Sequence, residues 1–296
     1  MEENKNLKIR PIKNAPEITS VEILPGRDVR LTWCDAVGAE KYVIIRYSTI
    51  EGERVREKLE TLTAEFNTYR DTTINEDGSF EYKVIAKKKI GPKQYASKSS
   101  MAAIAEIISV EPPELKHIKG ESRKITISWD RDETVYGYVV LRRFAFMKKA
   151  MPIKVLKRGE TEYSDSKFAK GQLMYYSIQS IISSGDGFAY SKPSNELCSV
   201  ILPQPVVVEK KKRLGKKIDI TVRLCAGADG YVLFRRCSPE DEREEVMRTA
   251  GIDKFTVTDA EKKPAKELYY SVSCFRQSSE GIEFIGPESN LIHVRF

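Results

Sequence analysis

Histidine and cysteine are scarce in this sequence, and the few that occur form no recognisable metal site. The two histidines, His117 and His293, lie far from any cysteine or carboxylate cluster with metal-binding spacing. The five cysteines are an odd number, contain no Cys-x-x-Cys spacing and do not recur at matching places along the chain. We therefore expect free thiols and no metal or other cofactor, with Cys225–Cys274 as the one disulfide pairing that stays open.

Long apolar runs are also missing. No stretch approaches the roughly 18 to 20 apolar residues that a membrane-spanning helix requires, so no span is predicted. The first residues, Met1 to Lys8, are polar and lack the apolar core of a secretory signal. We expect a cytoplasmic chain, or an extracellular one if a signal segment has been removed.

Catalytic motifs are absent as well. The sequence has no Gly-x-Ser-x-Gly elbow, no phosphate-binding glycine loop and no His-Glu-x-x-His. Two histidines leave few candidates for general-base catalysis near neutral pH. Carboxylate pairs such as Asp132-Glu133 lie in charged segments, where solvation accounts for them. The sequence therefore predicts a protein that is not an enzyme.

Basic residues outnumber acidic ones, and the net charge of +7 is spread along the chain. Residues 1–108 carry 18 basic and 17 acidic side chains, residues 109–202 carry 15 and 11, and residues 203–296 carry 17 and 15. The exception is a basic run that comprises Lys210, Lys211, Lys212, Arg213, Lys216 and Lys217. One interpretation of this run is that its lysines protect an exposed sheet edge from pairing, and the alternative is contact with a polyanion. No aromatic residue is interleaved, so nucleic acid is the less favoured partner.

The sequence contains a threefold repeat. Alternating apolar residues open each copy, in Val29-Arg-Leu-Thr-Trp33, Ile125-Thr-Ile-Ser-Trp129 and Ile218-Asp-Ile-Thr-Val222. A tyrosine-led strand follows each, in Tyr42-Val-Ile-Ile-Arg46, Tyr138-Val-Val-Leu-Arg142 and Tyr231-Val-Leu-Phe-Arg235. An aspartate and a second tyrosine complete each copy, in Asp71 and Tyr82, Asp165 and Tyr176, and Asp259 and Tyr270. Short strands of period two, separated by turns, predict β-sandwiches.

These landmarks give each copy a family resemblance. With Trp33, Tyr42, Asp71 and Tyr82 in this order, the first copy resembles a fibronectin type III domain of the bacterial type, an immunoglobulin-like fold. The third copy departs, because Val222 replaces the tryptophan and Val257 the tyrosine two residues before Asp259. The resemblance predicts an all-β chain of three tandem sandwiches. The expected ranges are an N-terminal tail (1–15) and domains at 16–108, 109–202 and 203–296.

The core and one polar corner of each domain follow from this alignment. Alternation directs Leu31 and Trp33 inward, where they face Tyr42 and Ile44. The resemblance places Tyr82, Tyr176 and Tyr270 at a tyrosine corner, with a buried ring and a hydroxyl that reaches backbone of the preceding loop. Asp71, Asp165 and Asp259 are then expected to cap that loop through their carboxylates.

The tyrosine-led strands are apolar at positions that should face outward. These residues are Val43, Ile45, Val139, Leu141, Val232 and Phe234. Ordinary β propensity, with lysine and arginine stems covering the side chains, is one interpretation. A protein-binding face repeated on each domain is the other. Burial between consecutive domains is disfavoured, because the proline-containing linkers at 107–114 and 201–206 predict a stiff, extended array of roughly 100 Å.

The function predicted from these features is a structural or adaptor protein that binds other proteins through a row of sandwiches. The alternatives are an accessory module of a carbohydrate-handling or phage-tail-like assembly and a polyanion binder acting through the basic run. Fold similarity alone does not choose among them.

Overall fold

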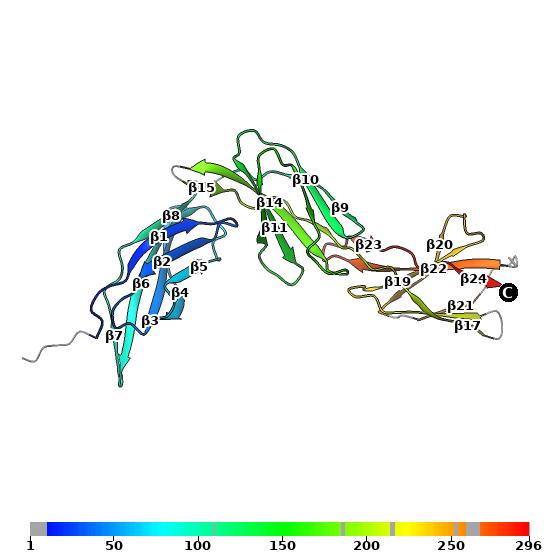
Figure 1. The fold of residues 1–296 in the computed structure, drawn as a ribbon, viewed down its shortest axis with the longest axis horizontal. Helices are drawn as coiled ribbons and strands as arrows, with labels where there is room; N and C mark the ends of the chain where they lie inside the picture. The colour runs from blue at the N-terminus through cyan, green and yellow to red at the C-terminus, as the bar shows by residue number, and fades with distance from the viewer. Residues whose placement is uncertain are drawn as a thin grey trace, which may run out of the picture.

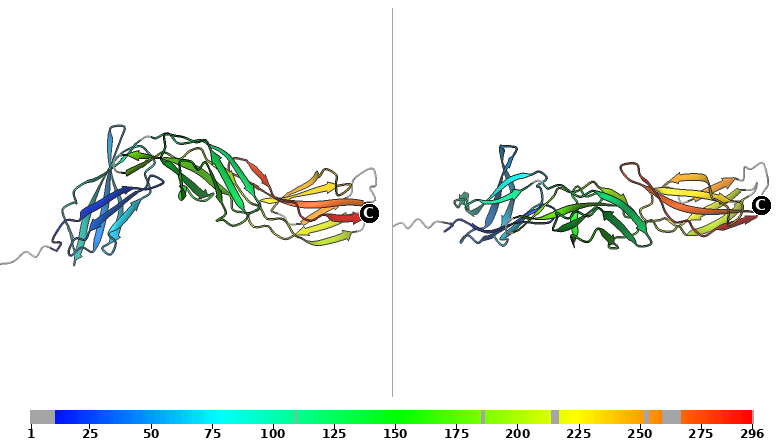
Figure 2. Two further views of the ribbon diagram at one scale, coloured as in Figure 1. Left: turned by 45° about the horizontal axis from the view of Figure 1, so that its top comes forward. Right: turned by 90° about the horizontal axis from the view of Figure 1, so that it is seen from above.

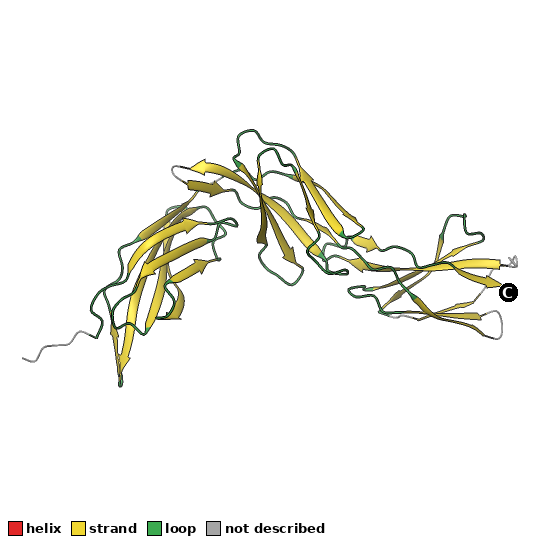
Figure 3. Cartoon of the chain, viewed as in Figure 1, coloured by secondary structure: helices red, strands yellow, loops and turns green. Residues whose placement is uncertain are grey.

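The computed structural model describes residues 11–108, 110–184, 187–213, 217–251, 254–258 and 267–295. Within these residues every regular element is a strand, and the strands form three groups along an elongated chain (Figures 1 and 3). The all-β fold of tandem immunoglobulin-like sandwiches is therefore confirmed.

Each group of strands is called a domain below. Domain one contains β1 (Glu17–Ile23), β2 (Val29–Cys34), β3 (Lys41–Ile50), β4 (Glu53–Thr63), β5 (Thr68–Asp71), β6 (Gly78–Ile90), β7 (Lys93–Ala96) and β8 (Ala103–Ile107). Domain two contains β9 (Leu115–Glu121), β10 (Lys124–Trp129), β11 (Gly137–Phe144), β12 (Met151–Lys157), β13 (Glu162–Asp165), β14 (Met174–Ser184), β15 (Gly187–Tyr190) and β16 (Leu197–Ser199). Domain three contains β17 (Val207–Arg213), β18 (Lys217–Val222), β19 (Gly230–Arg236), β20 (Glu244–Ala250), β21 (Lys254–Thr258), β22 (Glu267–Gln277), β23 (Glu283–Ile285) and β24 (Ile292–Arg295).

Two antiparallel sheets build each domain. A three-stranded sheet has the order β1-β2-β5, β9-β10-β13 or β17-β18-β21. A five-stranded sheet has the order β4-β3-β6-β7, β12-β11-β14-β15 or β20-β19-β22-β23, with β8, β16 or β24 also paired to its third strand. Residues 237–243 connect β19 to β20.

The array is elongated but not straight. Figures 1 and 2 show domain one inclined against domain two, whereas domains two and three follow one another more nearly in line. The first joint therefore introduces a bend that the stiff-linker argument did not anticipate.

Alternating side chains fill the space between the sheets. Along β2, Val29, Leu31 and Trp33 are buried, and the residues between them are not. Trp33 meets Tyr42 edge to face at 5.5 Å between ring centroids, and the equivalent rings of domain two lie 5.4 Å apart. Ile44 is also buried, so the predicted inward residues of domain one are confirmed. Burying one such aromatic ring contributes on the order of 2–3 kcal/mol.

Domain three departs from the alignment made on sequence. Pairing of β18 with β21 sets Phe255 opposite Ile220, the place that Tyr69 holds opposite Leu31 in domain one. Val257 then pairs with Ile218 and takes the register position of Asp71. The expected equivalence of Val257 with a tyrosine was therefore wrong by two residues. Asp259 lies outside the described residues, and fully buried Phe255 restores an aromatic ring to the core.

A buried polar network joins the two sheets of domain one. The Tyr82 hydroxyl donates to Asp71 Oδ2 at 2.8 Å, and Arg46 Nη1 donates to the same oxygen at 2.6 Å. The Thr73 amide donates to Asp71 Oδ1 at 2.9 Å, so the aspartate caps the loop as predicted. The tyrosine hydroxyl, however, reaches a carboxylate and not the backbone. Arg46 and its counterpart Arg142, four residues after the leading tyrosines Tyr42 and Tyr138, were the sequence feature that could have predicted this network.

Domain two repeats the network. Tyr176 and Arg142 donate to Asp165 Oδ2 at 2.8 and 2.7 Å, and the Lys167 amide donates to Oδ1 at 2.9 Å. Burial by itself would raise the pKa of the Asp165 carboxyl. These hydrogen bonds and the arginine charge outweigh burial and hold that pKa below its ordinary value.

We predict that Asp71→Asn lowers the free energy of unfolding of domain one by about 3 kcal/mol, because it removes the buried carboxylate that pairs with Arg46 at 2.6 Å and leaves that charge with the exposed Glu57. Hydrogen exchange of β5 and β6 would report the loss. Glu17→Gln, an exposed carboxylate change in the same domain, should leave exchange unaltered. Equal protection in both variants would contradict the role given to the network.

Stability should also depend on pH through Asp71 and Asp165. Both carboxyls have a pKa that is lowered in the folded chain, so the unfolded chain binds more protons in acid. Their contribution is present above about pH 4 and is lost as pH falls through the lowered pKa values. Denaturant unfolding measured between neutral pH and about pH 2 should show this loss, with a shallower pH dependence when both residues are asparagine. An unchanged slope would count against it.

Candidate functional site

The predicted apolar partner face is not exposed. The six side chains at Val43, Ile45, Val139, Leu141, Val232 and Phe234 keep between 0% and 5% of their surface accessible. Sequence alternation correctly directed them away from the sandwich core, but it could not show what covers them. The prediction of a free binding surface was therefore wrong, because these six residues are covered.

In domains one and three, cations from neighbouring strands and loops provide the cover. Register sets Lys58 and Lys83 on either side of Ile45. In domain three the Arg243 guanidinium lies 4.3 Å from the Phe234 ring centroid. The long stems of these cations shield apolar side chains while their charged ends stay in water. Coverage by lysine and arginine was one of the two interpretations of the sequence.

In domain two, domain one contributes to the cover. Val139 and Leu141 form a buried cluster with Ile181 and Tyr190, and Ile23 at the end of β1 packs against it. Burial between consecutive domains had been disfavoured because the proline-containing linkers predicted a stiff, extended array. The bend at the first joint makes it possible, since it brings the end of domain one over the sheet.

A turn in domain one forms the polar centre of this joint. Pro25 and Gly26 occupy the middle of a turn closed by the Arg27 amide donating to the Leu24 carbonyl at 2.9 Å. Gly26 has a φ of +87°, which this turn requires and which glycine adopts without strain. Its amide is then free to donate to Gln179 Oε1 of domain two at 2.9 Å, in a buried hydrogen bond.

Ion pairs surround that hydrogen bond. Lys149 of domain two lies 2.6 Å from Asp28 of domain one, and Asp28 also pairs with Arg70 at 2.7 Å. Lys192 of domain two pairs with Glu76 at 3.3 Å. The Asp28 side chain is only 3% exposed, so salt screens this pair less than the Lys192 pair.

The second joint is built mainly from backbone and apolar contacts. Gly171 and Gly227 approach so closely that a Cβ on Gly171 would lie 1.9 Å from the Ala226 carbonyl oxygen. Arg276 donates to the carbonyls of both glycines, at 3.0 Å to Gly227. The buried core cluster of domain three extends into domain two and includes Leu173, Tyr175, Cys198, Val200 and Leu202. The core of domain three therefore continues onto one end of domain two, whose own core around Trp129 is a separate cluster.

The basic run lies on a sheet edge. β17 is the outer strand of its sheet and pairs with β18, so this position matches the edge-protection interpretation. Lys210, Lys211 and Lys217 are exposed, and Lys210 donates to the His293 carbonyl. The side chains of Lys212 and Arg213, and all of Lys216, lie outside the described part. Contact with a polyanion stays a prediction.

The described residues contain neither a cluster of metal ligands nor a membrane-spanning helix. They contain no group of three or more histidine, cysteine, aspartate or glutamate side chains that could hold a metal ion. A helix long and apolar enough to cross a membrane is likewise not found among them. The five thiols are free, and burial raises the pKa of Cys274 to about 12, so this thiol is protonated at neutral pH.

We predict that Gly171→Ala disrupts the second joint, because the added methyl would collide with backbone of domain three. Small-angle scattering should then show a broader range of domain two–three orientations. Gly52→Ala is the matched control. Gly52 has a φ of +85° against +81° for Gly171, but a Cβ there meets nothing within 4 Å. Both variants therefore carry similar backbone strain, and identical scattering curves would refute the steric argument.

Comparisons with known proteins were made for the whole chain. No family model matches it, and no curated protein sequence shows significant similarity. Among solved structures, the chain is similar to the FN1–FN3 domains of chicken CNTN1, with 17% sequence identity, a TM-score of 0.29 and coverage of 96% of this chain and 98% of that chain. It is also similar to a two-domain fibronectin type III segment of chicken tenascin, with 14% identity, a TM-score of 0.26 and coverage of 64% and 98%. The fold described above depends on the observed strand pairing and not on these likenesses.

Proposed function

We propose that this chain is a non-enzymatic structural adaptor that holds three β-sandwiches in a fixed, bent array and presents successive domains to a protein partner. The observation that carries the proposal is that both joints are built interfaces. The first contains a buried hydrogen bond between Gly26 and Gln179, and the second shares the apolar core of domain three.

Fixed joints suit an adaptor for an energetic reason. A flexible tether would lose conformational freedom whenever one partner engaged two domains, and that loss would weaken binding. An array already held in one geometry avoids this cost, because folding has ordered the domains beforehand. The exposed, charged outer surfaces then decide which partner is bound.

The alternatives stay predictions. A carbohydrate-associated module would present a row of exposed aromatic rings along one face. The exposed aromatic residues in the described part of the chain are Phe66, Tyr95, Tyr136, Phe146 and Phe188. Two of these rings, Tyr136 and Phe188, contact each other, and both belong to domain two. No specific contact favours the carbohydrate or the polyanion function over the adaptor.

The proposal predicts one overall geometry in solution. Small-angle scattering of the full chain should fit a single bent array, and combining Gln179→Ala with Lys149→Glu should convert it to a distribution of bends. Lys148→Glu changes an adjacent charge outside the Asp28 ion pair and should leave the curve unaltered. A wild-type chain that already requires many domain orientations would contradict the proposal.

Partner binding can be compared in the same variants. Crosslinking and mass spectrometry of a native lysate should yield a protein joined to two domains of the wild-type chain. The joint-breaking double variant should lose the two-domain crosslink, whereas Lys148→Glu should keep it. Retention of that crosslink in both variants would mean that joint geometry does not matter for capture.

A further inference from the structure

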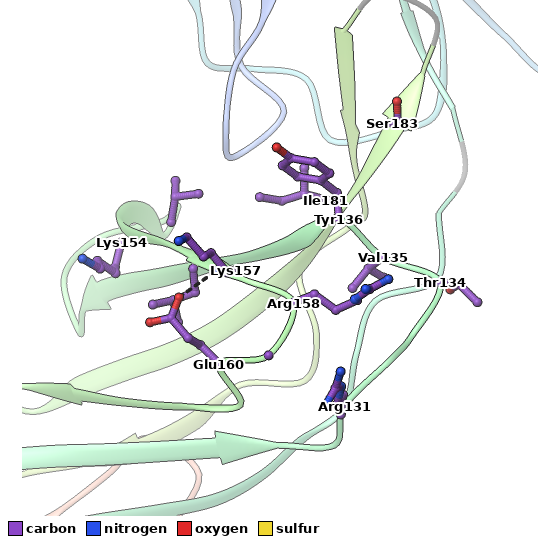
Figure 4. Close-up of a pocket in the computed structure, with 13 residues that line it drawn as sticks. Arg131, Thr134, Val135, Tyr136, Lys154, Lys157, Arg158, Glu160, Ile181 and Ser183 are labelled. Atoms are coloured by element: carbon purple, nitrogen blue, oxygen red, sulfur yellow. Dashed lines mark hydrogen bonds between the residues drawn. The ribbon is translucent and has the colours of Figure 1, made fainter.

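A depression on domain two is lined by side chains that the adaptor proposal does not use. It is a groove of about 940 Å³ on the outer side of the five-stranded sheet, lined by parts of β12, β14 and the loop before β11. This volume lies within the range of about 300–1,000 Å³ that is usual for ligand sites. Figure 4 shows Lys154, Lys157, Arg131 and Arg158 around it, with the Tyr136 ring beside Ile181.

The charge of the lining is predominantly positive. Among the described lining residues, those four cations face a single carboxylate, Glu160. A neighbouring carboxylate, Glu133, pairs with Arg131 at 2.7 Å and with Arg158 at 3.7 Å. In the described part of the chain, neither Lys154 nor Lys157 has an ion-pair partner, and both are exposed. The two lysines are therefore available to an incoming anion.

Apolar and aromatic surface lies between these charges. Tyr136 is 64% exposed, Val155 is 55% exposed, and the Tyr136 ring contacts Phe188 at 4.8 Å between centroids. Exposed rings and aliphatic side chains gathered at one place are typical of protein-binding surfaces, where tyrosine, phenylalanine and arginine are enriched. Lysines on the edge strand β12 would be enough to prevent pairing with another sheet, but that role would not require the exposed Tyr136 and Phe188 rings.

The groove is also ordered before any ligand arrives. The Tyr136 amide donates to the Ile181 carbonyl at 2.7 Å, and Val135 beside it is buried. Asp132 caps the same loop by accepting from the Thr134 amide at 2.8 Å. Across the groove, Arg158 donates to the Glu133 carbonyl at 2.9 Å. A ligand would therefore meet a lining that needs little further ordering, which favours affinity.

We propose that this groove binds an acidic segment of a partner protein that also carries apolar or aromatic side chains. Its carboxylates would pair with Lys154 and Lys157, and its apolar side chains would cover Val155 and Tyr136. A single-stranded nucleic acid fits less well, because such sites stack successive bases on several rings, whereas Tyr136 is the only ring among the described lining residues and already contacts Phe188. The proposal rests on the adaptor function and names the chemistry of its partner.

The test uses the full chain and a fluorescein-labelled dodecapeptide of alternating glutamate and tyrosine. Fluorescence anisotropy should show saturable binding, and Lys154→Glu with Lys157→Glu should weaken it about tenfold or more through charge repulsion. Lys119→Glu with Lys124→Glu, the same charge change on β9 and β10 of the other sheet, should leave binding within about twofold of wild type. The matching lysine–tyrosine peptide and a dT12 oligonucleotide provide the ligand controls.

Each result decides the proposal. Absence of saturable binding to the acidic peptide would overturn it, as would equal loss in the two double variants. Tighter binding of dT12 through Lys154 and Lys157 would overturn it in favour of nucleic acid. Should charge reversal lower the melting temperature, Tyr136→Ser provides a second test, since it removes an exposed ring and should still weaken binding measurably. A failure here would leave the scattering test of the adaptor unaffected.

Discussion

Each five-stranded sheet is apolar on both faces, and the structure depends on how the outer face is covered. The inner face packs into the sandwich, whereas the outer face has no second sheet to meet. Exposed, it would cost the free energy of hydrating several aliphatic side chains per domain. Domains one and three cover it with neighbouring cations such as Lys83 and Arg243. Domain two covers part of it with Ile23 of domain one, and this contact places the two domains at an angle.

The two joints are held by different kinds of contact, so they respond differently to ionic strength. At the first joint, a small apolar contact is combined with the Gly26–Gln179 hydrogen bond and the Asp28–Lys149 ion pair. At the second, the apolar core passes from one domain into the next and two glycine backbones touch. Ionic conditions therefore act mainly on the bend, whereas the connection between domains two and three depends on shape and apolar burial. The groove on domain two lies on the same sheet as the first joint, so joint and groove share β14.

Sequence reasoning recovered much of the fold but little of the candidate sites. Alternation identified the buried faces of β2 and β3, and the spacing of Asp71 and Tyr82 marked a corner that is indeed polar. It failed in domain three, where thirteen residues separate Val257 from Tyr270 but eleven separate Asp71 from Tyr82. The two extra residues in domain three shift the alignment, and the alternation within the strands does not reveal them. No sequence pattern identified Gln179 or Gly171, because the role of each depends on residues of another domain.

The sequence by itself determined the class of fold, the inward residues of the first core and the absence of recognised catalytic motifs. These follow from local periodicity and residue type, which act over a few neighbouring positions. Only the tertiary structure decided whether the outward residues Val139 and Leu141 are free or covered. It also decided which turn meets which sheet and where Lys154, Lys157 and Tyr136 converge. Those outcomes depend on contacts between segments far apart in the chain, and periodicity within a strand carries no information about its distant neighbours.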